Sequence, residues 1–448
     1  MIKVCKFGGT SMADGMTMRR VKDIFESDPE RRYIVVSAPG KRFSGDIKVT
    51  DLLYETHKEV EETGSCGEAF EKICARFSGI VQELKIDLDI ESILQETKKA
   101  IEEEKSADFA ASRGEYLSGR IMAALLNIPF IDARDVIKFD ASGKLESARS
   151  FELLARALSG KPKALVTGFY GEGADGKVKT FSRGGSDISG AIVARAAGAA
   201  LYENWTDVSG FLACDPRIVE NPVPIRSLSY KELRELSYMG ANVLHSESIF
   251  PVREADIPIR IKNTFRPEDE GTLIMPTSKY RFSGRTVTGV AGKKNFTVIF
   301  VEKSLMNLEI GFARKILTVL ENHGVSFEHI PTGIDTMSFI IDGAHLPNGV
   351  LEQIISEIKE SVHPDQMRVF DRISLIAVVG HGMSRNVGTS ARVFSAIAGA
   401  GVNVRMIDQG SSELNIIVGV DDENYERTLR AVYEEFFTGA EEIDPILA

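Results

Sequence analysis

The sequence has little of several features that mark particular classes of protein. Its 448 residues include four cysteines, none at CxxC spacing: Cys5, Cys66, Cys74 and Cys214. This pattern argues against a zinc site or a disulfide framework and favours a reducing, cytoplasmic setting. The chain also lacks a long cluster of Lys and Arg, and its formal charge is −11. Because binding to a phosphate backbone requires a basic face, no nucleic-acid partner is expected.

Long apolar runs are missing as well. No run approaches the roughly 18 residues that a membrane-spanning helix needs. The N-terminus enters a strand-like segment without a cleavable apolar region. We therefore expect a soluble protein with no membrane partner. The length, with 43% hydrophobic residues, predicts about two to four domains that each bury a core.

The motifs of common nucleotide-binding and hydrolytic classes are missing too. We find no Walker A sequence, no HRD or DFG set of the protein kinases, and no Ser–His–Asp set. Residues 171–176 match GxGxxG, but the residues that follow alternate like a strand and do not open a helix. We interpret this segment as a hairpin loop and not as a dinucleotide site.

What the sequence does have is a strand, a glycine turn and a helix pattern at its start. Residues 3–11 read KVCKFGGTS, and apolar residues at helical spacing follow. Two glycines let the backbone approach an anion without a Cβ clash, and Lys6 adds a positive charge beside them. The simpler alternative is a tight turn with a solvated lysine.

A second loop of the same kind lies far downstream. Residues 182–187 read SRGGSD and precede a helix predicted over Ile188–Ala197, which ends at Gly198. The simpler alternative is that Ser186 or Asp187 only caps this helix. A cap does not require an arginine and two glycines before it, so two phosphate-type loops are favoured.

Further polar residues stand where predicted strands end. Ser37 lies near the end of the strand predicted over Tyr33–Ala38, and Thr206 and Asp207 follow the strand predicted over Ala200–Trp205. In open α/β sheets, ligands bind at the carboxyl ends of strands. These residues are therefore candidates for nucleotide or metal-phosphate contact, although an Asx turn would also explain Asp207.

The clearest internal feature is a tandem repeat in the last third of the chain. Residues 320–341 align with residues 397–418 at a constant offset of 77, as between Gly324 and Gly401. The repeat predicts two β-α-β-β units of the ferredoxin-like pattern. Neither copy carries a convincing set of acids, bases or metal ligands. We therefore expect binding and assembly from this part of the chain and not chemistry.

Five segments taken together resemble the aspartokinase family. Their order and spacing match, and the resemblance covers essentially the full length. The segments are Lys6–Ser11, Ser112–Ser118, Phe181–Asp187, Thr206–Gly210 with Asp215–Arg217, and Ile257–Thr264 with Gly271–Ile274. The tandem repeat is similar to the paired ACT domains of that family.

The resemblance implies an α/β fold with a three-layer αβα catalytic domain of the amino-acid-kinase type. This domain would span residues 1–290. Two C-terminal ferredoxin-like ACT domains of the βαββαβ type would span 291–372 and 373–448, or the C-terminal segment would complete the first of them. The implied reaction moves the γ-phosphoryl of ATP, with Mg²⁺, to the β-carboxylate of L-aspartate. That carboxylate, with a reference pKa of about 4, arrives ionised, so no general base and no catalytic histidine are needed.

The resemblance also implies roles for individual residues. Lys6 would stabilise the transferring phosphoryl, and Arg183 would hold a substrate carboxylate through its planar fork. Glu115 and Asp187 would receive the ammonium group and help to set the reacting geometry, while Ser37 would offer a hydroxyl to the aspartate. The nucleotide side would consist of Gly8, Gly9, Thr10, Thr206, Asp207 and Arg217. No magnesium ligand is assigned. For Glu115, a capping box begun by Ser112 is an alternative reading of the residues.

By the same resemblance, the repeats would pair with those of another subunit in a homodimer or larger homo-oligomer. Feedback inhibition by lysine, alone or with threonine, is the habit of the family, whose reaction begins lysine, threonine and methionine biosynthesis. The effector pocket would consist of Met306, Ser326, Glu328 and Thr332, with Glu328 pairing with the effector ammonium. Ordinary strand and turn packing is the alternative for these four. No homoserine dehydrogenase extension is expected.

The chain departs from the family pattern on the implied nucleotide side. Asn242 stands where a lysine is common, Ser246 and Glu247 stand where Pro-Arg is frequent, and Leu212 stands where an aromatic is frequent. Two alternatives to an aspartate kinase remain. One is another acyl-phosphate-forming kinase of this fold, acting on glutamate or acetylglutamate. The other is a catalytically idle amino-acid sensor.

Overall fold

The computed structural model describes residues 1–182, 184–241, 243–244, 248–280, 285–346 and 349–438. The chain divides into two compact units. The first contains Met1–Phe211, Pro224–Leu233 and Asn242–Tyr280, and the second contains Leu212–Val223, Arg234–Ala241 and Arg281–Ala448.

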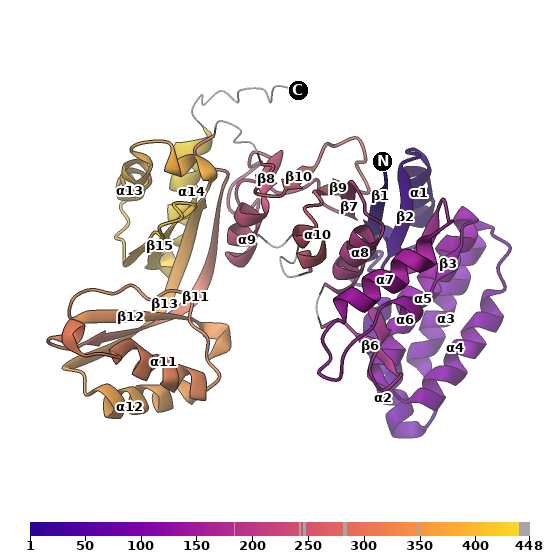
Figure 1. The fold of residues 1–448 in the computed structure, drawn as a ribbon, viewed down its shortest axis with the longest axis horizontal. Coiled ribbons are helices and arrows are strands. Elements are labelled where there is room, and N and C mark those ends of the chain that lie inside the picture. Colours follow the sequence, from indigo (N-terminus) through magenta and orange to yellow (C-terminus); the bar gives the residue numbers. More distant parts are fainter. Residues whose placement is uncertain (183, 242, 245–247, 281–284, 347–348, 439–448) are drawn as a thin grey trace. The chain divides into compact units, whose positions relative to one another are not determined.

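The first unit is built on a mostly parallel sheet with the strand order β3-β4-β2-β1-β7-β9-β10-β8 (Figure 1). Neighbouring strands run parallel except β9 and β10. The strands are β1 Lys3–Phe7, β2 Arg31–Val36, β3 Phe130–Ile131, β4 Ala164–Thr167, β7 Leu201–Thr206, β8 Ser227–Ser229, β9 Ile259–Asn263 and β10 Thr272–Met275. Apolar residues on both faces bury the central strands, as a sheet covered by two helical layers requires.

Helices cover this sheet on both faces. Helices α1 and α5 pack on β2, and α8 packs on β1, β2 and β7 from the other side (Figure 1). The prediction of a three-layer αβα catalytic fold is therefore confirmed. The helices are α1 Gly15–Glu26, α2 Val49–Thr63, α3 Glu68–Leu84, α4 Ile90–Glu104, α5 Ala107–Leu126, α6 Ala133–Val136, α7 Ser147–Leu158, α8 Gly185–Ala196 and α10 Phe250–Glu254. Helix α9, Tyr230–Tyr238, begins in the first unit and ends in the second.

Two local predictions have clear outcomes. The GxGxxG segment is a hairpin loop, because it joins the antiparallel strands β5, Tyr170–Glu172, and β6, Val178–Thr180. The capping box at Ser112 was wrong, because α5 begins at Ala107 and Ser106 is its N-cap. The Ser112 hydroxyl lies inside the helix and donates to the Phe109 carbonyl over 2.6 Å. A serine inside a helix commonly bonds to the preceding turn in this way, which its sequence context did not reveal.

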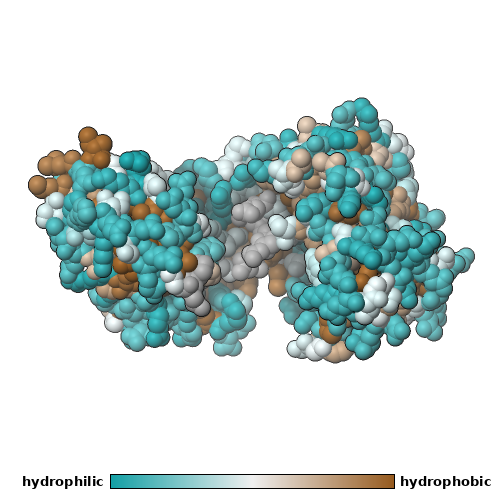
Figure 2. All heavy atoms as spheres, turned by 90° about the horizontal axis from the view of Figure 1, so that it is seen from below, coloured by the Kyte–Doolittle hydropathy of each residue, from teal (hydrophilic) through white to brown (hydrophobic). Residues whose placement is uncertain are grey.

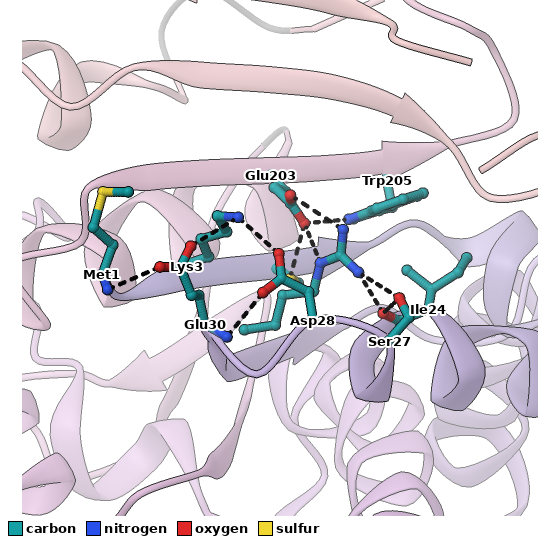
Figure 3. Close-up of polar contacts among 10 residues, drawn as sticks. Met1, Lys3, Ile24, Ser27, Asp28, Glu30, Glu203 and Trp205 are labelled. Carbon is teal, nitrogen blue, oxygen red and sulfur yellow. Dashed lines mark hydrogen bonds and ion pairs between the residues drawn. The ribbon is translucent and has the colours of Figure 1, made fainter. Parts of the chain in front are cut away.

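A buried ion pair joins strands β2 and β7 (Figure 3). Arg31 at the start of β2 donates from Nε to Glu203 on β7 over 2.7 Å, and the two side chains are 11% and 5% exposed. The Trp205 indole donates to the same carboxylate over 3.1 Å. The outer part of the network is less buried. There the N-terminal ammonium and Lys3 pair with Glu30, whose side chain is 34% exposed.

Glu203→Leu is expected to destabilise the first unit by about 3–5 kcal/mol, because it leaves the Arg31 charge buried without a carboxylate. Trp205 is the single tryptophan of the chain, so urea unfolding followed by its fluorescence reports on this unit directly. Glu30→Gln is the matched control and should shift the midpoint little, since its ion pairs are exposed. Equal midpoints for the two variants would contradict the prediction.

The second unit contains an antiparallel sheet with the strand order β12-β11-β13-β15-β14. Its strands are β11 Gly289–Glu302, β12 Thr336–Asp342, β13 Gln366–Val379, β14 Met406–Asp408 and β15 Asn415–Asp421. Its helices are α11 Phe312–Asn322, α12 Val350–Val362, α13 Thr389–Gly399 and α14 Tyr425–Phe437. Helices α11 and α12 pack side by side, and so do α13 and α14 (Figure 1).

The tandem repeat is visible in this unit. Helices α11 and α13 have bounds that differ by the predicted 77 residues at both ends. Strands β11 and β13 pair along most of their length, so both repeats share one sheet. Residues 296–302 of β11 pair with β12, whereas residues 289–293 pair with the end of β13 that also contacts β15. The domain boundaries predicted at 291 and 373 fall within these two long strands.

The face in Figure 2 is dominated by hydrophilic residues, with hydrophobic ones in smaller patches, as expected of a chain in which 27% of residues are charged. Within the described ranges, no helix combines the length and the apolar character needed to cross a membrane.

Candidate active site

The carboxyl ends of three neighbouring parallel strands form the floor of the candidate site. Strand β1 lies between β2 and β7, and Lys6 on β1 is in register with Val35 on β2 and Asn204 on β7. Because parallel strands end at the same edge, the loops after β1, β2 and β7 meet there. The residues predicted from separate segments of the chain are thereby brought within reach of one another.

An ion pair joins the two glycine-containing loops. The Lys6 ammonium lies 2.5 Å from Oδ1 of Asp187, and both side chains are largely buried, at 9% and 16% exposed. Asp187 stands in the first turn of α8, whose N-cap is Gly184 and has no side-chain cap. The alternative that Asp187 merely caps this helix was wrong, because its carboxylate is directed at Lys6. Arg183, predicted to hold a substrate carboxylate, lies outside the described residues.

Two hydroxyl contacts connect further predicted residues. The Ser37 hydroxyl, after β2, donates to the Ser186 hydroxyl over 2.9 Å. On the other side of Lys6, the Thr10 hydroxyl donates to Asp207 over 3.3 Å, and Thr206 donates to the same carboxylate over 3.2 Å. The structure therefore groups Ser37 with the α8 loop and groups Thr10 with the end of β7.

Glu115 enters the site from α5 as a buried carboxyl. It is 5% exposed, and its Oε2 has no hydrogen-bond partner among the described residues. Burial raises the pKa of Glu115 to about 8, while backbone N–H groups, including that of Ala38, and the Lys6 charge oppose the shift. Gly114 permits the close approach of α5, because a Cβ there would lie 2.6 Å from the Ala38 Cβ. The arrangement presents a carboxyl oxygen suited to an incoming cation.

The predicted glycine cradle is partly engaged by the protein itself. The Gly8 N–H donates to the Trp205 carbonyl over 3.0 Å, and the Gly9 carbonyl accepts from the Gly40 N–H over 2.8 Å. These bonds fasten the loop after β1 to β7 and to the loop after β2. The loop is therefore held in place before any ligand arrives.

Arg217, predicted on the nucleotide side, lies in the second unit. Its guanidinium pairs with Asp215 over 2.6 Å, and its side chain is 85% exposed. Leu212 belongs to the same unit. Asn242, Ser246 and Glu247, where the chain departs from the family pattern, lie outside the described residues.

The four predicted effector residues all belong to the second unit. Met306 is buried in the core that contains Met337, and Thr332 forms an isolated bridge with Met337, near the start of β12. Glu328 lies four residues earlier, where its N–H donates to the Ile340 carbonyl over 2.7 Å. Four extended residues span about 13 Å, so Glu328 and Thr332 lie at opposite ends of this run. Ser326 is exposed beside Glu328.

Glu328 also belongs to a group of possible metal ligands. Its carboxylate, that of Asp342 and the His345 ring offer atoms within 4.8 Å of one another. Two of these groups already have partners, because Tyr238 donates to Glu328 and Lys293 pairs with Asp342. The Lys293 ammonium already neutralises the Asp342 carboxylate, whose charge a metal ion would otherwise neutralise. The group is therefore better described as a cluster of ion pairs.

Sequence reasoning missed Asn204. This residue is 3% exposed on β7, and its Nδ2 donates to Oδ1 of Asp187 over 2.9 Å. The available signal was a polar amide in the middle of an otherwise largely buried strand, Leu201–Thr206, two residues before Thr206 and Asp207.

Comparison with known proteins agrees with this architecture. Residues 1–263 match the model of the amino acid kinase family, and residues 376–436 match an ACT domain. The fold and the site thus define an amino acid kinase with a C-terminal regulatory-type unit.

Aspartokinase 3 of Bacillus subtilis is 39% identical over 98% of this chain and 99% of its own length. The crystal structure of Clostridium acetobutylicum aspartate kinase has a TM-score of 0.91 at 50% identity and covers 97% of this chain and 100% of that one. Escherichia coli aspartokinase III in complex with aspartate and ADP has a TM-score of 0.76 at 25% identity, covering 98% and 100%. The chain belongs to the aspartokinase family, and its enzyme class is that of an aspartate kinase.

Proposed function

We propose that this aspartate kinase transfers the γ-phosphoryl of ATP to the β-carboxylate of L-aspartate and forms 4-phospho-L-aspartate. The observation that carries the proposal is the Lys6–Asp187 ion pair, which joins the two glycine loops next to the buried Glu115. The E. coli enzyme's complex with aspartate and ADP supports the choice of ligands. The reaction would begin lysine, threonine and methionine biosynthesis.

In this mechanism the protein positions two anions and neutralises the charge between them. Lys6 stabilises the phosphoryl group in transfer, while Gly8, Gly9 and Thr10 hold the loop beside it. Glu115 and Asp187 receive the substrate ammonium, and Ser37 donates a hydrogen bond to the substrate. Arg183 is assigned to a substrate carboxylate by its motif alone. The acceptor carboxylate arrives ionised, so no residue has to remove a proton.

The nucleotide side is assigned to Thr206, Asp207 and Arg217. Asp187 contacts Lys6, and Asp207 accepts a hydrogen bond from Thr10 in the first glycine loop. Carboxylate oxygens such as theirs are the ligands that Mg²⁺ prefers. Bound Mg²⁺ would neutralise charge on the β- and γ-phosphates of ATP.

The acceptor is tested by trapping the acyl phosphate with hydroxylamine. Wild-type protein with MgATP is assayed with L-aspartate, L-glutamate and N-acetylglutamate in parallel. Hydroxamate formation with aspartate well above the other two supports the proposal. Faster reaction with glutamate or acetylglutamate would replace the acceptor, and no reaction with any of them would favour an idle sensor.

We further propose feedback inhibition by lysine, alone or with threonine, through the second unit of a homodimer or larger homo-oligomer. E. coli aspartokinase III has been crystallised with lysine and aspartate in a T-state. Glu328 is assigned to the effector ammonium, together with Met306, Ser326 and Thr332. The four residues would hold one effector molecule where the second units of two chains pair.

Glu328→Gln is expected to raise the half-inhibitory lysine concentration by about tenfold or more, because the effector ammonium loses a hydrogen bond to a charged group. Tyr238→Phe should lower that concentration severalfold, because the Tyr238 hydroxyl occupies the Glu328 carboxylate. Inhibition curves at fixed aspartate measure both effects. Glu321→Gln, on the exposed side of α11, is the matched control. Identical curves for Glu328→Gln and Glu321→Gln would remove Glu328 from the effector site.

A further inference from the structure

Asn204 lies beside the catalytic lysine and has no role in the mechanism described so far. It stands on β7 directly opposite Lys6 on β1, and it is 3% exposed. Its Nδ2 donates to Oδ1 of Asp187 over 2.9 Å. The Lys6 ammonium contacts the same oxygen over 2.5 Å. One carboxylate oxygen of Asp187 is therefore held by a charged donor and by a neutral one.

Strand β7 also holds the main chain of Asp187. The Tyr202 hydroxyl, two residues before Asn204, donates to the Asp187 carbonyl over 3.1 Å. The phenol reaches α8 because Gly190 has no side chain, and a Cβ there would lie 2.4 Å from the Tyr202 oxygen. The side chain and the backbone of Asp187 are thus fixed separately, by two residues of one strand.

The two donors to the carboxylate differ in what they do during the reaction. If Lys6 stabilises the phosphoryl group, it has to direct its charge away from Asp187 at that moment. Leaving the largely buried Asp187 carboxylate without hydrogen-bond donors would cost free energy. The carboxylate would then rotate toward any other cation within reach. The Asn204 amide carries no net charge, so it holds the carboxylate without competing with the phosphoryl group for the lysine.

We propose that Asn204 is a positioning residue that holds the Asp187 carboxylate in place while Lys6 turns to the transferring phosphoryl group. The inference rests on the proposed function, because it uses the assignment of Lys6 to the phosphoryl. It assigns to β7 a part in the reaction that the glycine loops alone do not explain.

The test compares Asn204→Leu, which keeps the size but cannot donate, with Asn204→Asp, which donates only when protonated. Asn204→Leu is expected to lower kcat by about 10- to 100-fold at every pH, the effect of losing one hydrogen bond to a charged group. Asn204→Asp places a second buried carboxyl beside Asp187, and two carboxyls that share a site hold one proton to a raised pKa. This variant is therefore expected to lose progressively more activity, relative to wild type, as the pH rises from about 6 to 8.5 and the shared proton is lost. The measurements are kcat, the KM for aspartate, and calorimetric binding of MgATP.

Thr97→Val is the matched control, since it removes a buried hydrogen bond, from the Thr97 hydroxyl to the Ile93 carbonyl, within α4, which carries none of the residues assigned to the site. It should lower the melting temperature about as much as Asn204→Leu but keep kcat within about twofold of wild type. A parallel fall of kcat and melting temperature in both variants would show a merely structural role. So would a kcat for Asn204→Leu within twofold of wild type. Where Asn204→Leu does not fold, the pH profile of Asn204→Asp decides.

The acceptor that wild type phosphorylates best, L-aspartate or L-glutamate, is used for every variant. If that acceptor is glutamate and Asn204→Leu still lowers kcat, the proposed acceptor fails while the role of Asn204 stands. If wild type phosphorylates aspartate best and Asn204→Leu keeps its kcat, the proposed acceptor stands and the role of Asn204 fails.

Discussion

Lys6→Ala is expected to lower kcat for aspartate phosphorylation by about 10³-fold while the fold persists. The physical reason is that phosphoryl transfer needs little covalent work from the protein, so a buried cation beside the transferring group supplies a large share of the stabilisation. Lys6 is 7% exposed, so in its absence water cannot stabilise the charge on the phosphoryl group as it would at a surface. Asn204 still holds Asp187 in this variant, so the carboxylate keeps one donor.

The measurement is the steady-state rate of aspartyl hydroxamate formation, with circular dichroism to check the fold. Lys3→Ala is the matched control, because Lys3 lies on the same strand but pairs with Asp28 and Glu30 at the strand's other end. Its kcat should stay within about twofold of wild type, since neither Asp28 nor Glu30 is a residue of the candidate site. A Lys6→Ala variant with near-normal kcat would remove Lys6 from the mechanism.

Glu115→Gln is expected to raise the KM for aspartate by about 100-fold, with a smaller effect on kcat. Glutamine keeps the shape of the side chain but cannot neutralise an ammonium in a site that excludes water. Steady-state kinetics at saturating MgATP measure the effect. Glu96→Gln, on the exposed side of α4, is the control with unchanged KM. A KM within threefold of wild type would assign the ammonium to another group.

The same residue predicts how aspartate binding depends on pH. In the free protein, burial raises the pKa of Glu115 to about 8, so the carboxyl is mostly protonated at neutral pH. An ammonium binds the ionised form, so binding below pH 8 has to release a proton. The KM for aspartate should therefore rise as the pH falls from about 8 to 6, by up to tenfold per unit, and become flat in Glu115→Gln.

Calorimetry in buffers of different ionisation enthalpy counts this proton directly. Aspartate binding to wild type near pH 7 should release close to one proton, and binding to Glu115→Gln should release almost none. Proton release that is the same in both proteins would place the ionisation on another residue.

The local elements could be predicted from the sequence because each depends on residues close together in the chain. Alternating apolar residues identified β1, and β-branched residues identified β2. The strand-like residues after position 176 excluded a dinucleotide loop, and the 77-residue offset identified the repeat. The start of α5 was misplaced, because Ser106 and Ser112 both precede acidic residues and only packing selects the cap. The shared sheet of β11 and β13 could not be predicted, since each repeat by itself appears complete.

The candidate site divides in the same way. The sequence by itself determined that two glycine loops with cations stand at strand ends, and its motifs indicated an aspartokinase, because loop chemistry is local and short. Only the tertiary structure decided that Lys6 pairs with Asp187, that Glu115 is a buried carboxyl with a raised pKa, and that the Asn204 amide donates to the Asp187 carboxylate. Those facts depend on β1 lying between β2 and β7 and on α5 and α8 packing against them, so they arise from contacts and water exclusion between segments far apart in the chain.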